Sequence, residues 1–172
     1  MIIKDIEEIN ETPLEGTMYS EIFNCGIDVV IGEYSENPKK LLPYAEKCAE
    51  EFNTLSQKLI DEICEAAKRF YIHFIDKIDE EWENEVKDRM SVEINDDTDA
   101  KEILNCFTLY TLSIEEPNDE RIGYRISGSC EWDSEHGIEI AILDEKLVYL
   151  GPFLCTDPWN VYDSEWNFIH KQ

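Results

Sequence analysis

The sequence predicts a single α+β domain with an N-terminal β-hairpin, a long buried helix and a C-terminal antiparallel β-meander. Three observations support this fold class: short alternating apolar runs near residues 18–33, apolar residues at every third or fourth position over 52–78, and renewed alternation from 106 to 150. The 172 residues are a typical length for one domain, so we treat 1–172 as a single unit.

The N-terminal third predicts a hairpin after a polar start. Residues 1–16 are polar and acidic, and we expect a loosely ordered lead-in there. Residues 18–24 have the pattern of one strand and 27–33 that of a second, with Cys25 and Gly26 as the tight turn between them.

The strongest secondary-structure signal is a long helix over residues 43–77, either continuous or broken once. Pro43 suits the first turn of such a helix. Two neighbouring stripes follow helical spacing: Phe52, Leu55, Leu59, Ile63, Ala66, Phe70 and Phe74, then Ile60, Cys64, Ala67, Tyr71, Ile75 and Ile78. Two stripes make a wide apolar face, which we expect to lie under a sheet or against a partner subunit.

The second half of the chain predicts mainly strands. Residues 79–85 form an acidic loop or short helix around Trp82, and 95–99 supply capping residues for a short helix over 100–105. Strands are expected at 106–114, 122–130, 138–143 and 147–150, in an antiparallel meander. The aromatic tail from Gly151 onward is expected to pack as an irregular closing segment.

Charge narrows the classes of partner. Forty Asp and Glu residues against fifteen Lys and Arg give a formal net charge of −25 at pH 7. The sequence therefore predicts no nucleic-acid partner, because phosphates need basic residues, and no anionic membrane surface for the same reason. The charge either attracts a basic protein partner or only keeps the chain soluble.

Cysteine usage and the absence of targeting signals predict a cytoplasmic protein. None of the six cysteines forms a C-x-x-C pair, so a zinc ribbon or a thioredoxin-type site is not expected. The first residues lack the apolar run of a signal peptide, and no segment has the ~20 apolar residues of a membrane span. We expect reduced thiols, with Cys48 and Cys64 as small core residues.

The catalytic motifs sought along the chain are missing. There is no G-x-S-x-G, no Walker loop and no G-x-G-x-x-G, so we predict no catalytic residues and no cofactor. The densest polar segment is 131–137, where Asp133, Glu135 and His136 either form a turn or ligate a divalent metal, or Glu135 orients His136 as a base. The turn is favoured because Asp and Ser bond nearby amides and Gly137 gives a permissive backbone.

Aromatic residues among acids mark a predicted partner-binding surface. Trp159, Asp163 and Glu165 could receive Lys and Arg side chains through cation–π contacts and ion pairs, or the tryptophan could simply pack in the core. The candidate contact residues are Glu131, Asp133, Glu135, Trp159, Asp163 and Glu165.

The 131–137 segment, Trp-Asp-Ser-Glu-His-Gly after Glu131, followed by Ile138-Glu139-Ile140 and the strand 147–150, resembles a group of uncharacterised bacterial domains. Those domains carry a W-D-x-E-H-G turn between C-terminal strands, after a hairpin and a long helix. This chain departs from the group at Asp144-Glu145, where Asp-Gly is frequent, which leaves the hairpin turn type open. The resemblance implies an α+β fold and a non-enzymatic, immunity-protein-like role, and it brings no catalytic residues.

Three hypotheses about function remain. The first is a non-enzymatic acidic binding protein of immunity type that neutralises a basic partner such as a toxin. The second is a metal-dependent enzyme that uses Asp133, Glu135 and His136. The third is a structural, self-associating domain that uses the wide helix face as a homodimer seam.

Overall fold

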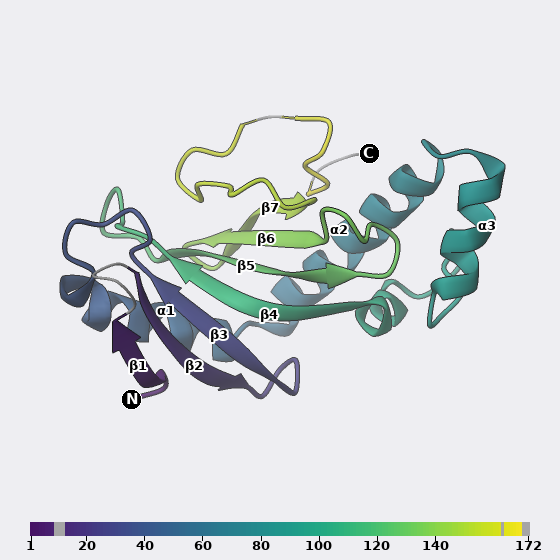
Figure 1. The fold of residues 1–172 in the computed structure, drawn as a ribbon. Coiled ribbons are helices and arrows are strands. Elements are labelled where there is room, and N and C mark those ends of the chain that lie inside the picture. Colours follow the sequence, from purple (N-terminus) through teal and green to yellow (C-terminus); the bar gives the residue numbers. More distant parts are fainter. Residues whose placement is uncertain (9–12, 163, 170–172) are drawn as a thin grey trace.

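The computed structural model describes residues 1–8, 13–162 and 164–169, and within them the strands form one seven-stranded sheet in the order β1 to β7. Helices cover one face of this sheet, and the C-terminal segment runs along β7 (Figure 1). The strands are β1 (Lys4–Glu8), β2 (Leu14–Ser20), β3 (Cys25–Ile31), β4 (Phe107–Ile114), β5 (Gly123–Cys130), β6 (Ile138–Leu143) and β7 (Lys146–Gly151). The helices are η1 (Pro38–Leu41), α1 (Leu42–Asn53), α2 (Gln57–Ile75), α3 (Glu80–Arg89) and η2 (Ala100–Cys106).

The α+β fold class, the N-terminal hairpin and the C-terminal antiparallel meander are confirmed, and both parts belong to the same sheet. They join where β3 pairs with β4 in parallel, with Ile31 opposite Ile114. Parallel neighbours need a crossover, and the helical segment between them supplies it. As a result, the loops that follow β3 and β4 leave the sheet at the same end of the strands. Hydrogen bonds join these loops, although they are about 80 residues apart in sequence.

The long helix is broken once, between Asn53 and Gln57. The Ser56 hydroxyl caps the second half by accepting a hydrogen bond from the Leu59 amide, and the Thr54 hydroxyl bonds back to the Glu50 carbonyl. All residues of the first stripe are buried, as are Cys64, Ala67 and Tyr71 of the second. The wide apolar face therefore packs within the chain, under the sheet, and does not form an exposed seam for a second copy.

The expected loosely ordered lead-in is wrong for most of residues 1–16. Lys4–Glu8 form the edge strand β1, and Leu14 to Gly16 open β2. Ile3 is fully buried, and the Ile2 amide donates to the carboxylate of Glu46 on α1. Burial of Ile3 and Leu14 and the hydrogen bond to Glu46 thus hold this mostly polar segment against the rest of the domain. Residues 9–12 of the predicted lead-in lie outside the described residues.

The predicted hairpin is correct in kind and wrong in register. Cys25 and Gly26 belong to β3, opposite Ser20 and Tyr19, and are not the turn. The connection runs over residues 21–24 and closes at Asn24, whose φ of 51° lies in the left-handed region. Asparagine tolerates that conformation, so the turn needs no glycine.

Trp132 is the aromatic centre of the core. It is fully buried, and its ring centroid lies 5.5 Å from that of Phe70, 6.0 Å from that of Tyr71 and 6.5 Å from that of Phe107, all edge to face.

The predicted acidic loop or short helix over residues 79–85 is a helix, α3, with Asp79 as its N-cap through a hydrogen bond from the Trp82 amide. None of the helices in the described residues is long and apolar enough to cross a lipid bilayer.

The C-terminal segment is irregular, as predicted, and is fixed by specific bonds to β7 and α2. The Asn167 side chain donates to the Val148 carbonyl and accepts from the Leu150 amide, while the Phe168 amide donates to the Leu150 carbonyl. Arg69 of α2 donates to the carbonyls of Phe168 and Ile169. The sheet is therefore covered on both faces at β6 and β7, but on only one face at β2 to β4.

Candidate functional site

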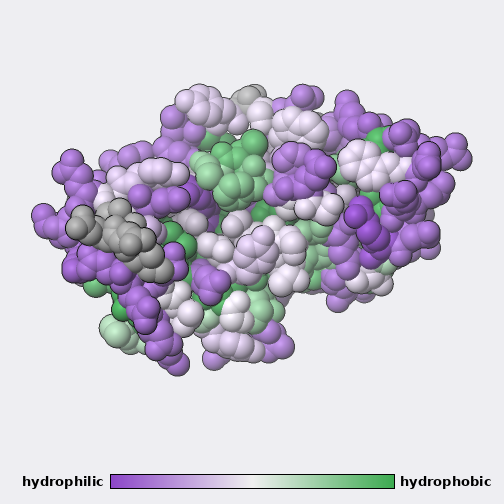
Figure 2. All heavy atoms as spheres, viewed as in Figure 1, coloured by the Kyte–Doolittle hydropathy of each residue, from purple (hydrophilic) through white to green (hydrophobic). Residues whose placement is uncertain are grey.

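Half of the outer face of the sheet, opposite the helices, is left uncovered. Strand pairing sets side chains of β2 to β5 side by side on this face; Glu15 lies next to Val30, Val30 next to Ser113, and Ser113 next to Arg125. We call this surface the open sheet face: Glu15, Thr17, Asp28, Val30, Thr111, Ser113, Arg125 and Ser127. Figure 2 shows it from the front, with hydrophilic side chains toward both ends and an apolar group beside the C-terminal segment. Phe153 and Leu154 of that segment are exposed.

Two shallow hollows lie on the open sheet face, and carboxylates line them. One, of about 370 Å³, is lined by Asp5, Glu7, Glu15 and Asp28 together with threonine and valine. The other, of about 650 Å³, extends from Glu15 and Glu33 to Arg125, Ser127 and His136. Together the linings contain five carboxylates and, among the described residues, one Lys or Arg, which is Arg125.

Arg125 is a buried cation on this face. Its side chain is 7% exposed, and its Nη2 lies 3.6 Å from Glu115 Oε1 and 3.8 Å from Glu33 Oε2. Both distances exceed the ~2.7–2.9 Å of a charge-assisted hydrogen bond. The guanidinium is thus surrounded by carboxylates but not held firmly by either one.

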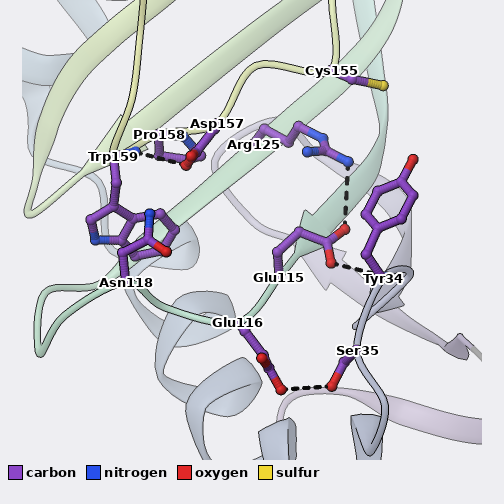
Figure 3. A pocket seen from close by; sticks show the side chains of 10 residues that line it. All are labelled: Tyr34, Ser35, Glu115, Glu116, Asn118, Arg125, Cys155, Asp157, Pro158 and Trp159. Carbon is purple, nitrogen blue, oxygen red and sulfur yellow. Dashed lines mark hydrogen bonds and ion pairs between the residues drawn. The ribbon is translucent and has the colours of Figure 1, made fainter.

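A pocket of about 370 Å³ opens beside Arg125, where the loops after β3 and β4 meet the C-terminal segment. We call it the Arg125 pocket; its lining is Tyr34, Ser35, Glu115, Glu116, Asn118, Arg125, Cys155, Asp157, Pro158 and Trp159. Figure 3 shows Arg125 above Glu115, with Tyr34 on one side and Trp159 on the other. The Tyr34 amide bonds to Glu115 Oε2 at 3.4 Å, and the Ser35 hydroxyl donates to Glu116 Oε1 at 2.8 Å.

Electrostatics in the Arg125 pocket are set mainly by burial. Desolvation raises the pKa of the Glu115 carboxyl, and the Tyr34 amide and Arg125 only partly offset it. Burial also raises the pKa of the Cys155 thiol, although Arg125 opposes the shift. At neutral pH the thiol is therefore protonated and a weak nucleophile.

The wall of the Arg125 pocket is held in place by a buried carboxylate. Glu139 of β6 is fully buried under the C-terminal segment, and its Oε1 accepts hydrogen bonds from the amides of Thr156 at 2.9 Å and Leu154 at 3.4 Å. Cys155, between them, has a φ of 54°, a left-handed conformation that is unusual for a residue with a side chain. The two bonds flank this residue and fix the segment across the outer face of β6.

The 131–137 segment forms a turn at the other end of β5. Asp133 is buried, and its Oδ1 accepts from the His136 amide, while its two carboxylate oxygens each lie 3.1 Å from His136 Nδ1. The carboxylate that contacts the imidazole is thus Asp133, not Glu135, which is exposed. Glu131 receives hydrogen bonds from the amide and hydroxyl of Ser91, so it anchors the loop after α3.

The five predicted contact residues that the structure describes do not gather into one surface. Trp159 packs against Gly123 at the start of β5, and its indole N–H donates to Asp119 at 3.2 Å. Glu131 follows the end of the same eight-residue strand, which places the two about 25 Å apart. Glu165 is exposed next to Trp166, whose ring lies 5.5 Å from His73 of α2, and Asp163 lies outside the described residues.

No group of three or more His, Cys, Asp and Glu side chains within the described ranges could hold a metal ion. The predicted metal alternative therefore gains no support from the geometry of Asp133 and His136. All six cysteines are free thiols, and Cys48 and Cys64 are fully buried on the helices. Burial raises their pKa values to about 12 and about 11.

Fold and site together define a class of domain: one mixed sheet, helices on a single face, and an acidic outer face with a buried arginine at its margin. The chain belongs to the family described as "Domain of unknown function (DUF6985)", whose match extends over residues 4–156. Curated proteins and solved structures give no match to the chain. The matched range includes Tyr34, Arg125 and Cys155 and ends before Trp159.

Of the residues that line the Arg125 pocket, the sequence suggested only Trp159 as a candidate. Tyr34 and Glu115 come together only because β3 and β4 pair in parallel, and local patterns carry no information on that pairing. One signal was available: Arg125 is a charged residue in the middle of a predicted strand, followed by Ile126. A lone arginine on the outward side of a strand in a chain of net charge −25 marks a point where carboxylates converge.

Proposed function

We propose that this protein is a non-enzymatic binding protein that attaches to a basic protein partner through the open sheet face. The observation that carries the proposal is the composition of that face. Five carboxylates line its two hollows, and Arg125, the one Lys or Arg among the described residues of the lining, is buried. A sheet face without a covering layer normally needs polar residues, and threonine and serine would suffice for that purpose. Carboxylates add a repulsion that a basic partner would relieve.

The open sheet face alone supplies a little more than half of the area that one partner contributes to an ordinary interface. Four strands at about 4.8 Å and seven residues at about 3.3 Å cover roughly 450 Å², against roughly 800 Å² per partner in a standard complex. The exposed side chains of Tyr34, Tyr110 and Phe153 lie around this area and would add contact surface. Aromatic rings next to carboxylates favour Lys and Arg through cation–π contacts and ion pairs.

The biological role that we infer is neutralisation of a basic toxin, in the manner of an immunity protein. An acidic face can occupy the cationic surface that a toxin uses for its own anionic substrate. The net charge of −25 supports such a role by electrostatic steering, which raises association rates at low salt.

The test uses purified products of the genes that flank the gene for this chain as binding probes. The double variant Glu15→Lys with Asp28→Lys reverses two exposed charges on the open sheet face. The matched control, Glu50→Lys with Glu65→Lys, makes the same charge change on the exposed side of α1 and α2. We expect salt-sensitive binding of a basic product, weakened about tenfold or more by the first variant and much less by the control.

Two outcomes would overturn the proposal. One is that no flanking product binds at low salt. The other is that both double variants weaken binding equally, because overall charge alone would then account for the interaction.

A further inference from the structure

The Arg125 guanidinium is a buried group whose hydrogen-bonding capacity is unused. Its Nε is buried and has no partner, and the side chain makes no hydrogen bond to any other described residue. Burying charged donors without acceptors is costly, so such a group calls for acceptor oxygens. Arg125 points into the pocket in Figure 3, where a ligand could supply them.

Carboxylates around the same pocket favour a positively charged group on a ligand. Glu115 Oε1 is buried without a hydrogen bond, and Glu116 and Asp157 also line the pocket. A simple anion would meet three carboxylates, and a simple cation would meet Arg125. A zwitterion with an acceptor group and a donor group a few bonds apart satisfies both sets.

The remaining lining fits a small ligand with a flat apolar part. A pocket of about 370 Å³ lies at the small end of the roughly 300–1,000 Å³ range for small-molecule sites. Tyr34 and Trp159 stand on opposite sides of it, and Asp119 holds the Trp159 ring through the indole N–H. Aromatic rings in such positions pack well against another planar ring.

We propose that the Arg125 pocket binds a free α-amino acid with an aromatic side chain. The α-carboxylate accepts hydrogen bonds from Arg125, in the bidentate manner for which a guanidinium is suited. The α-ammonium donates to Glu115 and Glu116, and the side chain lies between Tyr34 and Trp159. This small-molecule site shares Arg125 and Tyr34 with the surface proposed for the basic partner, but its ligand and its test do not require that partner.

The first experiment dissects the ligand by calorimetric titration of the full chain. The probes are L-phenylalanine, L-phenylalaninamide, which lacks the carboxylate, and 3-phenylpropionate, which lacks the ammonium. We expect one phenylalanine per chain, with each analogue at least about tenfold weaker, since each loses a charge-assisted pair. Equal affinity for the amide, or no binding of phenylalanine, tryptophan or tyrosine at about 10 mM, overturns the proposal.

The second experiment changes the protein. Arg125→Lys keeps the positive charge but removes the two parallel N–H donors of the guanidinium, and it should weaken phenylalanine binding about tenfold. Tyr34→Ala, at a side chain that is 75% exposed, leaves the fold intact and should also weaken binding. Arg89→Gln, an exposed arginine at the end of α3, is the control and should bind like the unmodified chain.

The alternative occupant of the pocket is the cationic side chain of a protein partner. Binding of Nα-acetyl-lysine amide together with failure of the aromatic amino acids would point to that occupant and refute the zwitterion. Unchanged phenylalanine affinity in both Arg125→Lys and Tyr34→Ala would equally refute it, because the ligand would then lie elsewhere.

Discussion

Gly137 lies where two segments of backbone approach more closely than any side chain allows, and Gly137→Ala should destabilise the protein strongly. The φ of Gly137 is 67°, and a Cβ built there falls 2.3 Å from the Gly128 carbonyl oxygen. That oxygen cannot move easily, because Gly128 pairs with Ile138 in the β5–β6 ladder. The left-handed conformation costs an alanine about 1 kcal/mol, and the overlap adds roughly 1–3 kcal/mol.

The expected total for Gly137→Ala is roughly 3 kcal/mol of unfolding free energy, or roughly 6–12 °C in Tm for a chain of this length. Urea unfolding followed by circular dichroism measures it directly. Gly26→Ala is the matched control, since a Cβ at Gly26 has no atom within 4 Å, and its effect should stay within about 0.5 kcal/mol. A loss below about 1 kcal/mol for Gly137→Ala would refute the reasoning, since it would mean that the turn and strand separate freely.

Three further predictions address the core, the thiols and the half-buried carboxyl of Glu115. Trp132→Ala removes the aromatic centre of the core and should cost roughly 3–5 kcal/mol in urea unfolding; a cost under about 1 kcal/mol would contradict the packing. Cys155 is the one exposed thiol of the six, so a thiol reagent should modify it first in the native state and Cys48, with its pKa raised to about 12, only after unfolding; rapid modification of several thiols would contradict the burial. The raised pKa of Glu115 makes the folded state hold its proton more tightly than the unfolded state, so this group lowers stability as pH rises from about 4.3 through the folded pKa. Glu115→Gln should therefore raise Tm at pH 7 and lose this advantage near pH 4; an advantage that is equal at both pH values would contradict the assignment.

The helical part of the fold could be predicted because its signal is local. The two stripes with spacings of three and four residues identified the helix, and the Ser56 and Thr54 side chains explain its single break. The β-meander was predictable for the same reason, and 138–143 coincides with β6. The 144–145 turn completes it with both residues at positive φ, of 54° and 59°, although neither is glycine.

The missed parts depend on contacts between distant segments. β1 has a single half-buried position, Ile6, and four exposed ones, so it lacks the alternation of apolar and polar residues that predicts a strand. Its place is determined by pairing with β2 and by the bond from the Ile2 amide to Glu46. The hairpin register was misjudged because glycine was assigned the turn that Asn24 makes.

The candidate site shows the same division. Asp133 and His136 are three residues apart, and their contact could be foreseen as a turn, although the sequence pointed to Glu135 as the partner of the imidazole. Arg125 and Tyr34 are about 90 residues apart and meet only through the parallel pairing of β3 with β4. A local pattern cannot predict a site assembled by a crossover connection.

The bonds that Asn167 and Phe168 make to Val148 and Leu150 also determine how copies of the chain behave toward one another. A strand at the border of a sheet has free amides and carbonyls that can recruit a strand from a neighbouring copy, and this is a route to aggregation. Here an asparagine amide and one backbone amide occupy that border, while the opposite border, β1, is short and has a charged residue at four of its five positions. Cleavage of the chain before Asn167 would expose the backbone of β7, and the shortened chain should oligomerise where the full chain remains dispersed.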